Sequence, residues 1–101
     1  MLVKSTDMEF ALKDDICRML KSYLDRFGEE LGLVCEAVTE NLEVNKPGAW
    51  ICLVGRKFVA NICHEPGHFI RISNENYHFV VFKLKFLNES SIAEGPCLIR
   101  K

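Results

Sequence analysis

The stretch from Trp50 to His68 places the tightest constraint on how this chain can fold. It contains two short runs rich in apolar and β-branched residues, Trp50 to Val54 and Phe58 to Cys63, separated by three residues that include a glycine. Runs of this composition around a short break predict paired β-strands. Alternate residues of the second run face opposite ways, and the face that contains Asn61 is mixed in polarity. A mixed face favours an edge or interface strand over a central one.

Amphipathic helices are expected upstream of these strands. In the first, apolar residues recur at helical spacing from Leu12 to Phe27, and charged residues fill much of the opposite face. The helix is expected to start near Thr6 or Asp7, whose side chains can cap free amide groups, with Glu9 spaced for a capping box. Gly28 is expected to end it. A second helix is predicted over residues 30–44, with an apolar stripe formed by Leu31, Val34, Val38 and Leu42.

Further strands are predicted at both ends of the chain. One short strand is expected over residues 2–5. Pro66-Gly67 predicts a turn, which is followed by a strand over residues 68–73 and a hairpin turn over residues 74–76. The last strand is predicted over residues 77–86. Its end alternates, with Phe82, Leu84 and Phe86 expected inward and Lys83 and Lys85 outward.

These elements predict the α+β class, with two helices packed on an antiparallel sheet in the order β-α-α-β-β-β-β. We expect residues 1–87 to form one domain and residues 88–101 to form an irregular C-terminal tail. The chain has 101 residues, of which 49% are hydrophobic, and this fits a single globular domain.

Charge and cysteine content exclude several classes of function. The formal net charge of -1 gives no reason to expect nucleic acid or a membrane as a partner. No apolar run approaches the roughly 18 residues of a membrane span, and the first residues lack the apolar core of a signal peptide. The number of cysteines is 5, which is odd, and they form no Cys-x-x-Cys pair. Reduced cysteines and a cytosolic location are expected.

The segment from His64 to His68 matches His-Glu-x-x-His, the zinc-protease motif. In those enzymes a helix places both imidazoles on one face, whereas Pro66 and Gly67 here favour a turn between extended runs. We therefore favour a strand-turn-strand whose histidines bond locally. A zinc site on Cys63, His64 and His68, or a nucleophilic Cys52 or Cys63 beside a histidine, is the less favoured alternative. No enzyme activity, metal or cofactor is expected.

The central stretch resembles the dynein light chain family of the eight-kilodalton type. The similarity runs from Leu2 to about Phe86, and the combination of Trp50, Gly55-Arg56, His64-Glu65 and His68-Phe69 at these spacings is fairly specific. The other matching residues in this part of the chain are Cys52, Val54, Phe58, Ile70, Phe82 and Lys83.

The resemblance implies a non-enzymatic, strand-swapped homodimer in which residues 58–63 cross to the partner subunit's sheet. Partner proteins such as the dynein intermediate chain would add an extended segment along that strand by β-augmentation. The implied groove and swapped strand consist of Phe58, Val59, Ala60, Asn61, Ile62, Cys63, His64, Phe69, Arg71 and Ser73. The implied dimer interface contains Ile51, Phe58, Asn61 and Cys63. The implied role is that of a subunit of a dynein motor complex. Its implied location is the cytoplasm, on the microtubule cytoskeleton or in the axoneme of a cilium.

The chain departs from the family pattern inside the groove. Arg71 and Ser73 stand where the family has tyrosines, and Asn61 replaces another tyrosine in the crossing strand. An altered peptide preference is expected, with acidic residues favoured beside Arg71. Two alternatives stay open: a family member that dimerises without a working groove, and a small zinc-dependent hydrolase that uses His64-Glu65-x-x-His68.

Overall fold

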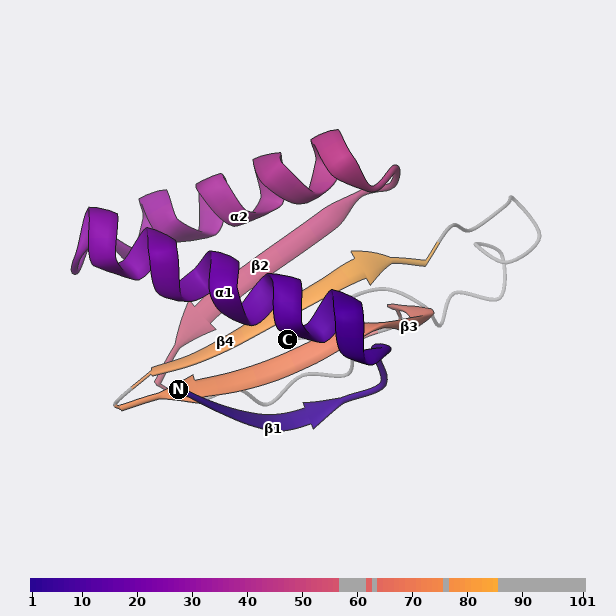
Figure 1. Ribbon diagram of the computed structural model, residues 1–101, viewed down its shortest axis with the longest axis horizontal. Coiled ribbons are helices and arrows are strands. Elements are labelled where there is room, and N and C mark those ends of the chain that lie inside the picture. Colours follow the sequence, from indigo (N-terminus) through magenta and orange to yellow (C-terminus); the bar gives the residue numbers. More distant parts are fainter. Residues whose placement is uncertain (57–61, 63, 76, 86–101) are drawn as a thin grey trace.

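The computed structural model describes residues 1–56, 62, 64–75 and 77–85 (Figure 1). Its elements follow in the order β-α-α-β-β-β. They are β1 (Leu2–Thr6), α1 (Phe10–Phe27), α2 (Leu31–Asn45), β2 (Trp50–Gly55), β3 (His64–Asn74) and β4 (Tyr77–Leu84). The predicted α+β class is confirmed. Most of the expected strand over residues 58–63, and the expected tail over residues 88–101, lie outside the described residues.

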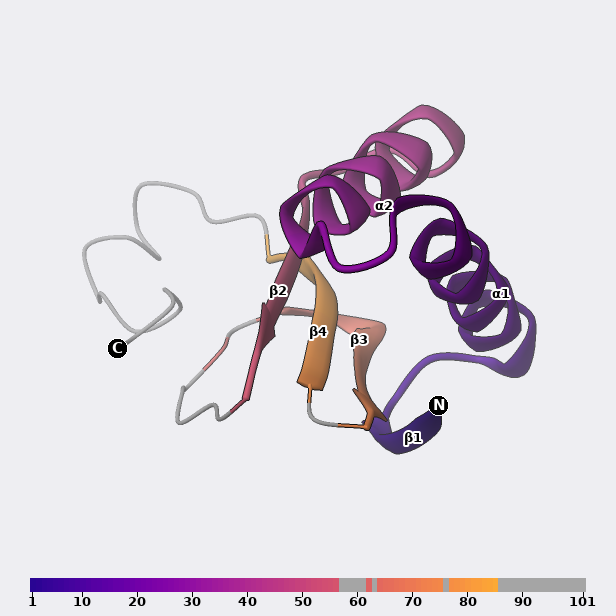
Figure 2. The ribbon, with the colours of Figure 1, turned by 90° about the vertical axis from the view of Figure 1, so that its left-hand side faces the viewer.

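The described strands form one antiparallel sheet in the order β1-β3-β4-β2. The hairpin of β3 and β4 occupies the centre, and the predicted turn between them lies at Glu75, since Asn74 pairs with Tyr77. Figure 2 shows α1 and α2 side by side on the same side of the sheet. We call the sheet face toward the helices the inner face and the opposite one the outer face. Within the described residues, no helix is long and apolar enough to cross a membrane.

Both helices bury the stripes that their sequences predict. Leu12, Ile16 and Leu20 are buried on α1, and Val34, Val38 and Leu42 on α2. α1 ends as expected at Gly28, whose φ of 61° is readily adopted only by glycine and whose N–H donates to the Leu24 carbonyl oxygen at 2.9 Å. The short connection that follows turns α2 back along α1.

The inner face of the sheet completes the core. Ile70 and Ile72 of β3 and Phe79 and Val81 of β4 are fully buried in one cluster with the helix stripes. Trp50, at the start of β2, joins the cluster and donates from Nε1 to the Lys46 carbonyl oxygen at 3.0 Å. That hydrogen bond satisfies the polar atom of a buried indole. The helices and the sheet are therefore joined by one continuous apolar layer.

The end of β4 alternates, but Phe82 and Leu84, which were predicted to point inward, lie on the outer face. Phe82 is buried, but strand alternation places it opposite Phe79 and Val81, on the outer face. Lys83 takes the inner side and is half-buried there, because its methylenes fill the space beside Gly48, which has no side chain. The prediction took apolar residues to mark the helix side, whereas β4 buries apolar residues on both faces. Phe86 lies outside the described residues.

Two local predictions near the helix start and β3 are wrong. The first helical residue is Phe10, and no side chain caps the N-terminus of α1. The oxygens of Thr6 and Asp7 instead bind β3. Pro66-Gly67 does not separate two strands, because β3 runs from His64 through it to Asn74. The β3–β4 register shifts between His64 and Phe69, and Gly67 absorbs the irregularity with a φ of 78°.

Candidate functional site

The outer face brings together residues that lie far apart in the sequence. Phe82 of β4 pairs with Phe69 on one side and Ile51 on the other, and Val80 pairs with Arg71 and Leu53 in the same way. Directly opposed residues in an antiparallel sheet share a face. The outer face of the described sheet therefore consists of Leu2, Ser5, Ile51, Leu53, Gly55, His64, Phe69, Arg71, Ser73, His78, Val80, Phe82 and Leu84.

Five of the predicted site residues lie on this one surface: Ile51, His64, Phe69, Arg71 and Ser73. All are half-buried. Ile62 is also half-buried, and the structure gives it no strand partner. The other predicted groove residues, Phe58, Val59, Ala60, Asn61 and Cys63, lie outside the described residues.

The outer face is apolar at its centre and polar at both ends. Val80 and Phe82 are buried in the middle, where they are paired with β2 and β3. One end carries Arg71, Ser73 and His78, and the other carries His64 stacked on Phe69 with ring centroids 4.9 Å apart. Sequence analysis missed His78, although its period-two spacing from Val80 and Phe82 places it on their face.

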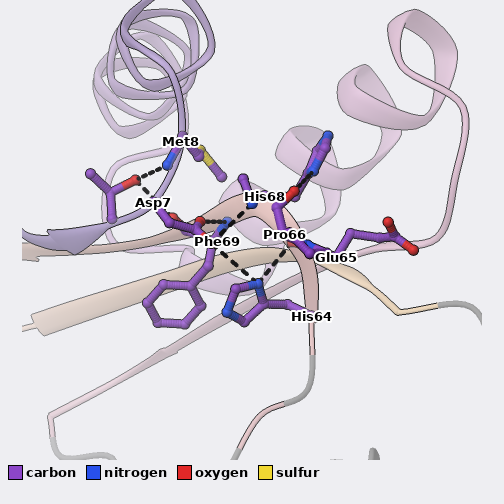
Figure 3. A network of polar contacts seen from close by, with 9 residues as sticks. Asp7, Met8, His64, Glu65, Pro66, His68 and Phe69 are labelled. Atoms are coloured by element: carbon purple, nitrogen blue, oxygen red, sulfur yellow. Dashed lines mark hydrogen bonds and ion pairs between the residues drawn. The ribbon is translucent and has the colours of Figure 1, made fainter.

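Asp7 anchors β3 beside this face (Figure 3). Its carboxylate accepts hydrogen bonds from the Gly67 N–H at 2.9 Å and the Phe69 N–H at 3.0 Å. Thr6 Oγ1 donates to the Phe69 carbonyl oxygen at 2.7 Å and accepts from the Met8 N–H at 3.0 Å. These bonds satisfy backbone groups of β3 that lie beyond the last β1–β3 pair, Thr6 with Ile70. The link between β1 and α1 therefore fixes the backbone that carries Phe69.

The two histidines of the His-Glu-x-x-His segment diverge. The His64 ring stacks on Phe69 of the outer face, whereas the His68 ring lies 5.7 Å from that of Trp50, which belongs to the inner core (Figure 3). Each Nδ1 donates to a nearby backbone carbonyl oxygen at 2.8 Å, His64 to Glu65 and His68 to Pro66. Rings on opposite sides of a strand do not converge on one ion as the zinc-protease motif does on a helix. Within the described residues, no cluster of His, Cys, Asp or Glu could hold a metal ion.

Cys52 does not stand beside a histidine, so the hypothesis of a Cys52–His pair is wrong. Its Sγ lies 3.2 Å from Cys35 Sγ, between β2 and α2 on the inner side. The Cys52 S–H donates to Cys35, which lowers the pKa of Cys35 from the ordinary value of 9.0. The same contact, together with burial, raises the pKa of Cys52 far above that value. Cys63, the other candidate, lies outside the described residues.

Comparison with known proteins settles the family. Residues 1–84 match the sequence profile described as dynein light chain type 1. The chain belongs to the dynein light chain family. A relative, "Dynein light chain 1, cytoplasmic" of Saccharomyces cerevisiae, is 33% identical over 82 residues, which are 81% of this chain and 88% of the yeast protein. The resemblance that the sequence carried is thus confirmed.

Solved structures agree with the fold of this light chain. The dynein light chain-like domain of the Fasciola hepatica calcium binding protein FhCaBP2 superposes with a TM-score of 0.73 at 15% identity, over 83% of this chain and 91% of that one. A second crystal structure of the same domain gives a TM-score of 0.70 at 16% identity, over 83% and 90%. At this identity the likeness concerns the fold alone. Family membership identifies a dynein-associated light chain of the cytoskeletal motor, from a family that is generally non-enzymatic.

Proposed function

We propose that this light chain is a non-enzymatic, dimeric hub that binds extended segments of partner proteins, as a subunit of a dynein motor complex. The observation that carries the proposal is the composition of the outer face, where Ile51, Leu53 and Phe69 are only half-buried around Val80 and Phe82. The helices cover the inner face alone. Among the described residues, no second layer comparable to the helices lies on the outer face, and an apolar sheet face is the kind of surface that a second subunit covers.

Dimerisation would use this face twice, once from each subunit. A twofold interface is self-complementary, and a sheet face with an apolar centre can meet that requirement. In this arrangement residues 58–63 cross to the partner's sheet, and Ile51, Phe58, Asn61 and Cys63 contribute to the interface. Each subunit would then offer one groove to an extended segment that adds as a further strand.

The oligomeric state provides the first test. We expect sedimentation at about 20 µM, well above the dissociation constant of a stable dimer, to give a dimer for the wild type. Leu53→Glu should give a folded monomer, because it places a charge at the centre of the outer face and leaves the inner core intact. Val44→Glu is the matched control, since Val44 is 84% exposed on α2. A monomeric wild type would contradict the proposal.

Peptide binding provides the second test. The probe is a synthetic segment of dynein intermediate chain, titrated into the full chain by calorimetry. We expect Phe69→Ala to weaken binding at least tenfold, because Phe69 lies on the outer face and its backbone is fixed by Asp7. Phe10→Ala removes the same ring from a position that is 72% exposed on α1, and it should leave binding unchanged. Equal affinities for both variants and the wild type would contradict a groove at Phe69.

The setting of this activity follows from the relatives. The yeast relative carries the word cytoplasmic in its name, and we propose the cytoplasm, on the microtubule cytoskeleton, as the location of this chain. An axonemal dynein of a cilium is the second setting that the proposal includes. Affinity purification from the native cell, followed by mass spectrometry of dynein heavy and intermediate chains, distinguishes the two. Recovery of neither type of dynein would contradict a role in the motor.

A further inference from the structure

Two nitrogen atoms at one end of the outer face are buried without a hydrogen-bond partner. They are Nε of Arg71 and Nδ1 of His78, and no atom in the described part of the chain bonds either of them. Neither side chain as a whole is fully buried. Most buried polar atoms in proteins are paired, because an unmade hydrogen bond in a buried place is costly. Two such atoms on one surface point to a ligand that supplies acceptors.

The strand register places these side chains together. Arg71 pairs with Val80, and Ser73 pairs with His78, so Arg71 and His78 are diagonal neighbours across β3 and β4. Such neighbours lie about 7–8 Å apart at the backbone, within the reach of long side chains. On its other side, His78 faces Gly55 of β2, which has no side chain to cover the imidazole. The hydroxyl group of Ser73 lies directly opposite His78 and adds another donor.

The electrostatic character of this corner favours an anion. Of the outer-face residues that are paired in the described sheet, none is acidic, whereas Arg71 and His78 at this corner can both carry positive charge. Arg71 also makes no ion pair within the described residues. A guanidinium group is always charged and offers only donors, and a carboxylate offers only acceptors in about four directions. One carboxylate can therefore satisfy donors on both strands.

We propose that Arg71 and His78 together recognise the carboxylate of an aspartate or glutamate in the bound segment, with Ser73 as an additional donor. The inference rests on the proposed peptide-binding function and specifies its ligand. Arg71 Nε–H and His78 Nδ1–H each donate to a carboxylate oxygen, and the apolar centre of the face receives the neighbouring side chains. This light chain thus selects acidic partner segments through side chains of two neighbouring strands, β3 and β4, rather than through a single residue.

A substitution scan of the intermediate-chain peptide tests the inference. Each position is replaced in turn by Glu and by Gln, and both peptides are titrated into the full wild-type chain. We expect one position, or two positions spaced two residues apart along the extended segment, to bind at least tenfold more tightly as Glu than as Gln. The isosteric pair isolates charge, because Gln keeps the shape and loses the anion.

Variants of the protein then assign that preference to its residues. Arg71→Gln and His78→Gln should each reduce the Glu-to-Gln ratio to below about threefold, since each removes one of two donors that act on the same carboxylate. Arg71→Lys should keep part of the ratio, because it keeps the charge and loses the Nε–H. Arg18→Gln is the control, since Arg18 is exposed on α1 and pairs with Asp14 and Asp15. That variant should keep the full ratio.

The outcomes separate the inference from the function on which it rests. If no peptide in the scan binds the wild type, the proposed function fails and the inference fails with it. If peptides bind but no position prefers Glu, or the preference survives in both Gln variants, only the inference is overturned. A preference for phosphoserine without a preference for Glu over Gln would also overturn it. Should Arg71→Gln fail to fold, as judged by circular dichroism, the ratio measured with His78→Gln decides.

Discussion

The inner and outer faces of the sheet are built from the same strands but differ in what they contain. On β3 and β4 the inner face presents Ile70, Ile72, Phe79 and Val81, all fully buried against the helices. The outer face presents Phe69, Arg71, Ser73 and His78 around Val80 and Phe82. The inner face is apolar where the helices cover it, whereas the outer face combines an apolar centre with groups that form hydrogen bonds. The comparison supports the proposal that the inner face holds the fold and the outer face serves a partner.

Phe79 to Phe82 shows the difference within a single strand. All four residues are buried, two on each face. A continuous apolar run is typical of a strand that is covered on both sides. The helices explain the burial of Phe79 and Val81. Val80 and Phe82 are buried within the single chain as well, and the proposed dimer would add a partner on their face. A truncation on each face should therefore destabilise the protein in a different way.

The largest effect is expected from Phe79→Ala. Removing a fully buried ring from a packed core costs about 3–5 kcal/mol of folding free energy. Phe79 belongs to the inner core cluster, so the loss should be the same at 2 µM and at 200 µM protein, two concentrations about 100-fold apart chosen to bracket a typical dimer equilibrium. Urea unfolding followed by circular dichroism measures it.

Phe82→Ala removes the same ring from the outer face and is the matched comparison. Its effect should depend on protein concentration, because a dimer interface stabilises folding only where the dimer forms. An equal loss of folding free energy for Phe79→Ala and Phe82→Ala, independent of protein concentration, would contradict the proposed difference between the two faces. It would show that the outer face is completed within a single chain.

A smaller effect is expected from Asp7→Ala, which tests the connection between the two faces. The carboxylate binds the N–H groups of Gly67 and Phe69, and a hydrogen bond to a charged group contributes about 1.5–3 kcal/mol when well made. The Asp7 side chain is 44% exposed, so solvent screening brings the expected loss to about 1–2 kcal/mol. Peptide affinity should fall as well, because Phe69 loses its anchor. An unchanged peptide affinity together with the loss of stability would show that the hydrogen bonds of Asp7 hold β3 but do not contribute to peptide binding.

The inner face could be predicted from the sequence, and much of the outer face could not. Helical periodicity identified Leu12, Ile16, Val34 and Val38, because one buried stripe per helix is a local property of the chain. The alternation in β4 is local too, but which side the helices take depends on register and long-range packing. Phe82 and Lys83 were consequently assigned to the wrong sides.

The candidate site depends even more on long-range pairing. Family resemblance identified Arg71 and Ser73, and β4 then places His78 beside them, seven residues after Arg71 in the chain. Asp7 was predicted to cap a helix because its local sequence fits a capping motif. In the structure, the irregular backbone of β3 offers N–H groups that compete for the same oxygens, and that competition depends on residues sixty positions away. No local sequence pattern predicts this competition.

A smaller, pH-dependent effect is expected from the Cys35–Cys52 contact on the inner side. The pKa of Cys35 is lowered below 9.0 by the hydrogen bond from Cys52, so between that lowered pKa and pH 9 the folded state holds fewer protons and stability rises with pH. The pKa of Cys52 is raised by the contact and by burial, so above pH 9 the unfolded state loses a proton that the folded state keeps. Stability then falls, by at most about 1.4 kcal/mol per pH unit for one proton.

Cys52→Val removes the contact while keeping an apolar side chain, and the other thiols cancel in the difference between the two proteins. The measurement is the free energy of unfolding of both proteins under reducing conditions, at several pH values on each side of the ordinary cysteine pKa of 9.0. The free energy of unfolding of the wild type, relative to that of the variant, should rise with pH up to that value and fall above it. A difference that does not vary with pH would show that the two sulfur atoms do not share a proton.

The smallest effect is expected from Val44→Ala, at an exposed position near the end of α2. Val44 is 84% exposed, and Val38 on the same helix is fully buried. Both substitutions replace a β-branched residue by alanine within one helix, so the gain in helix propensity is similar and small. Val38→Ala should cost about 1.5–3 kcal/mol, the value of burying a valine side chain, whereas Val44→Ala should stay within about 0.5 kcal/mol of the wild type. Val44→Ala could instead cost nearly as much stability as Val38→Ala, with a loss that grows with protein concentration. That result would mean that a partner also covers the helices. The outer face would then not be the one surface assigned to assembly.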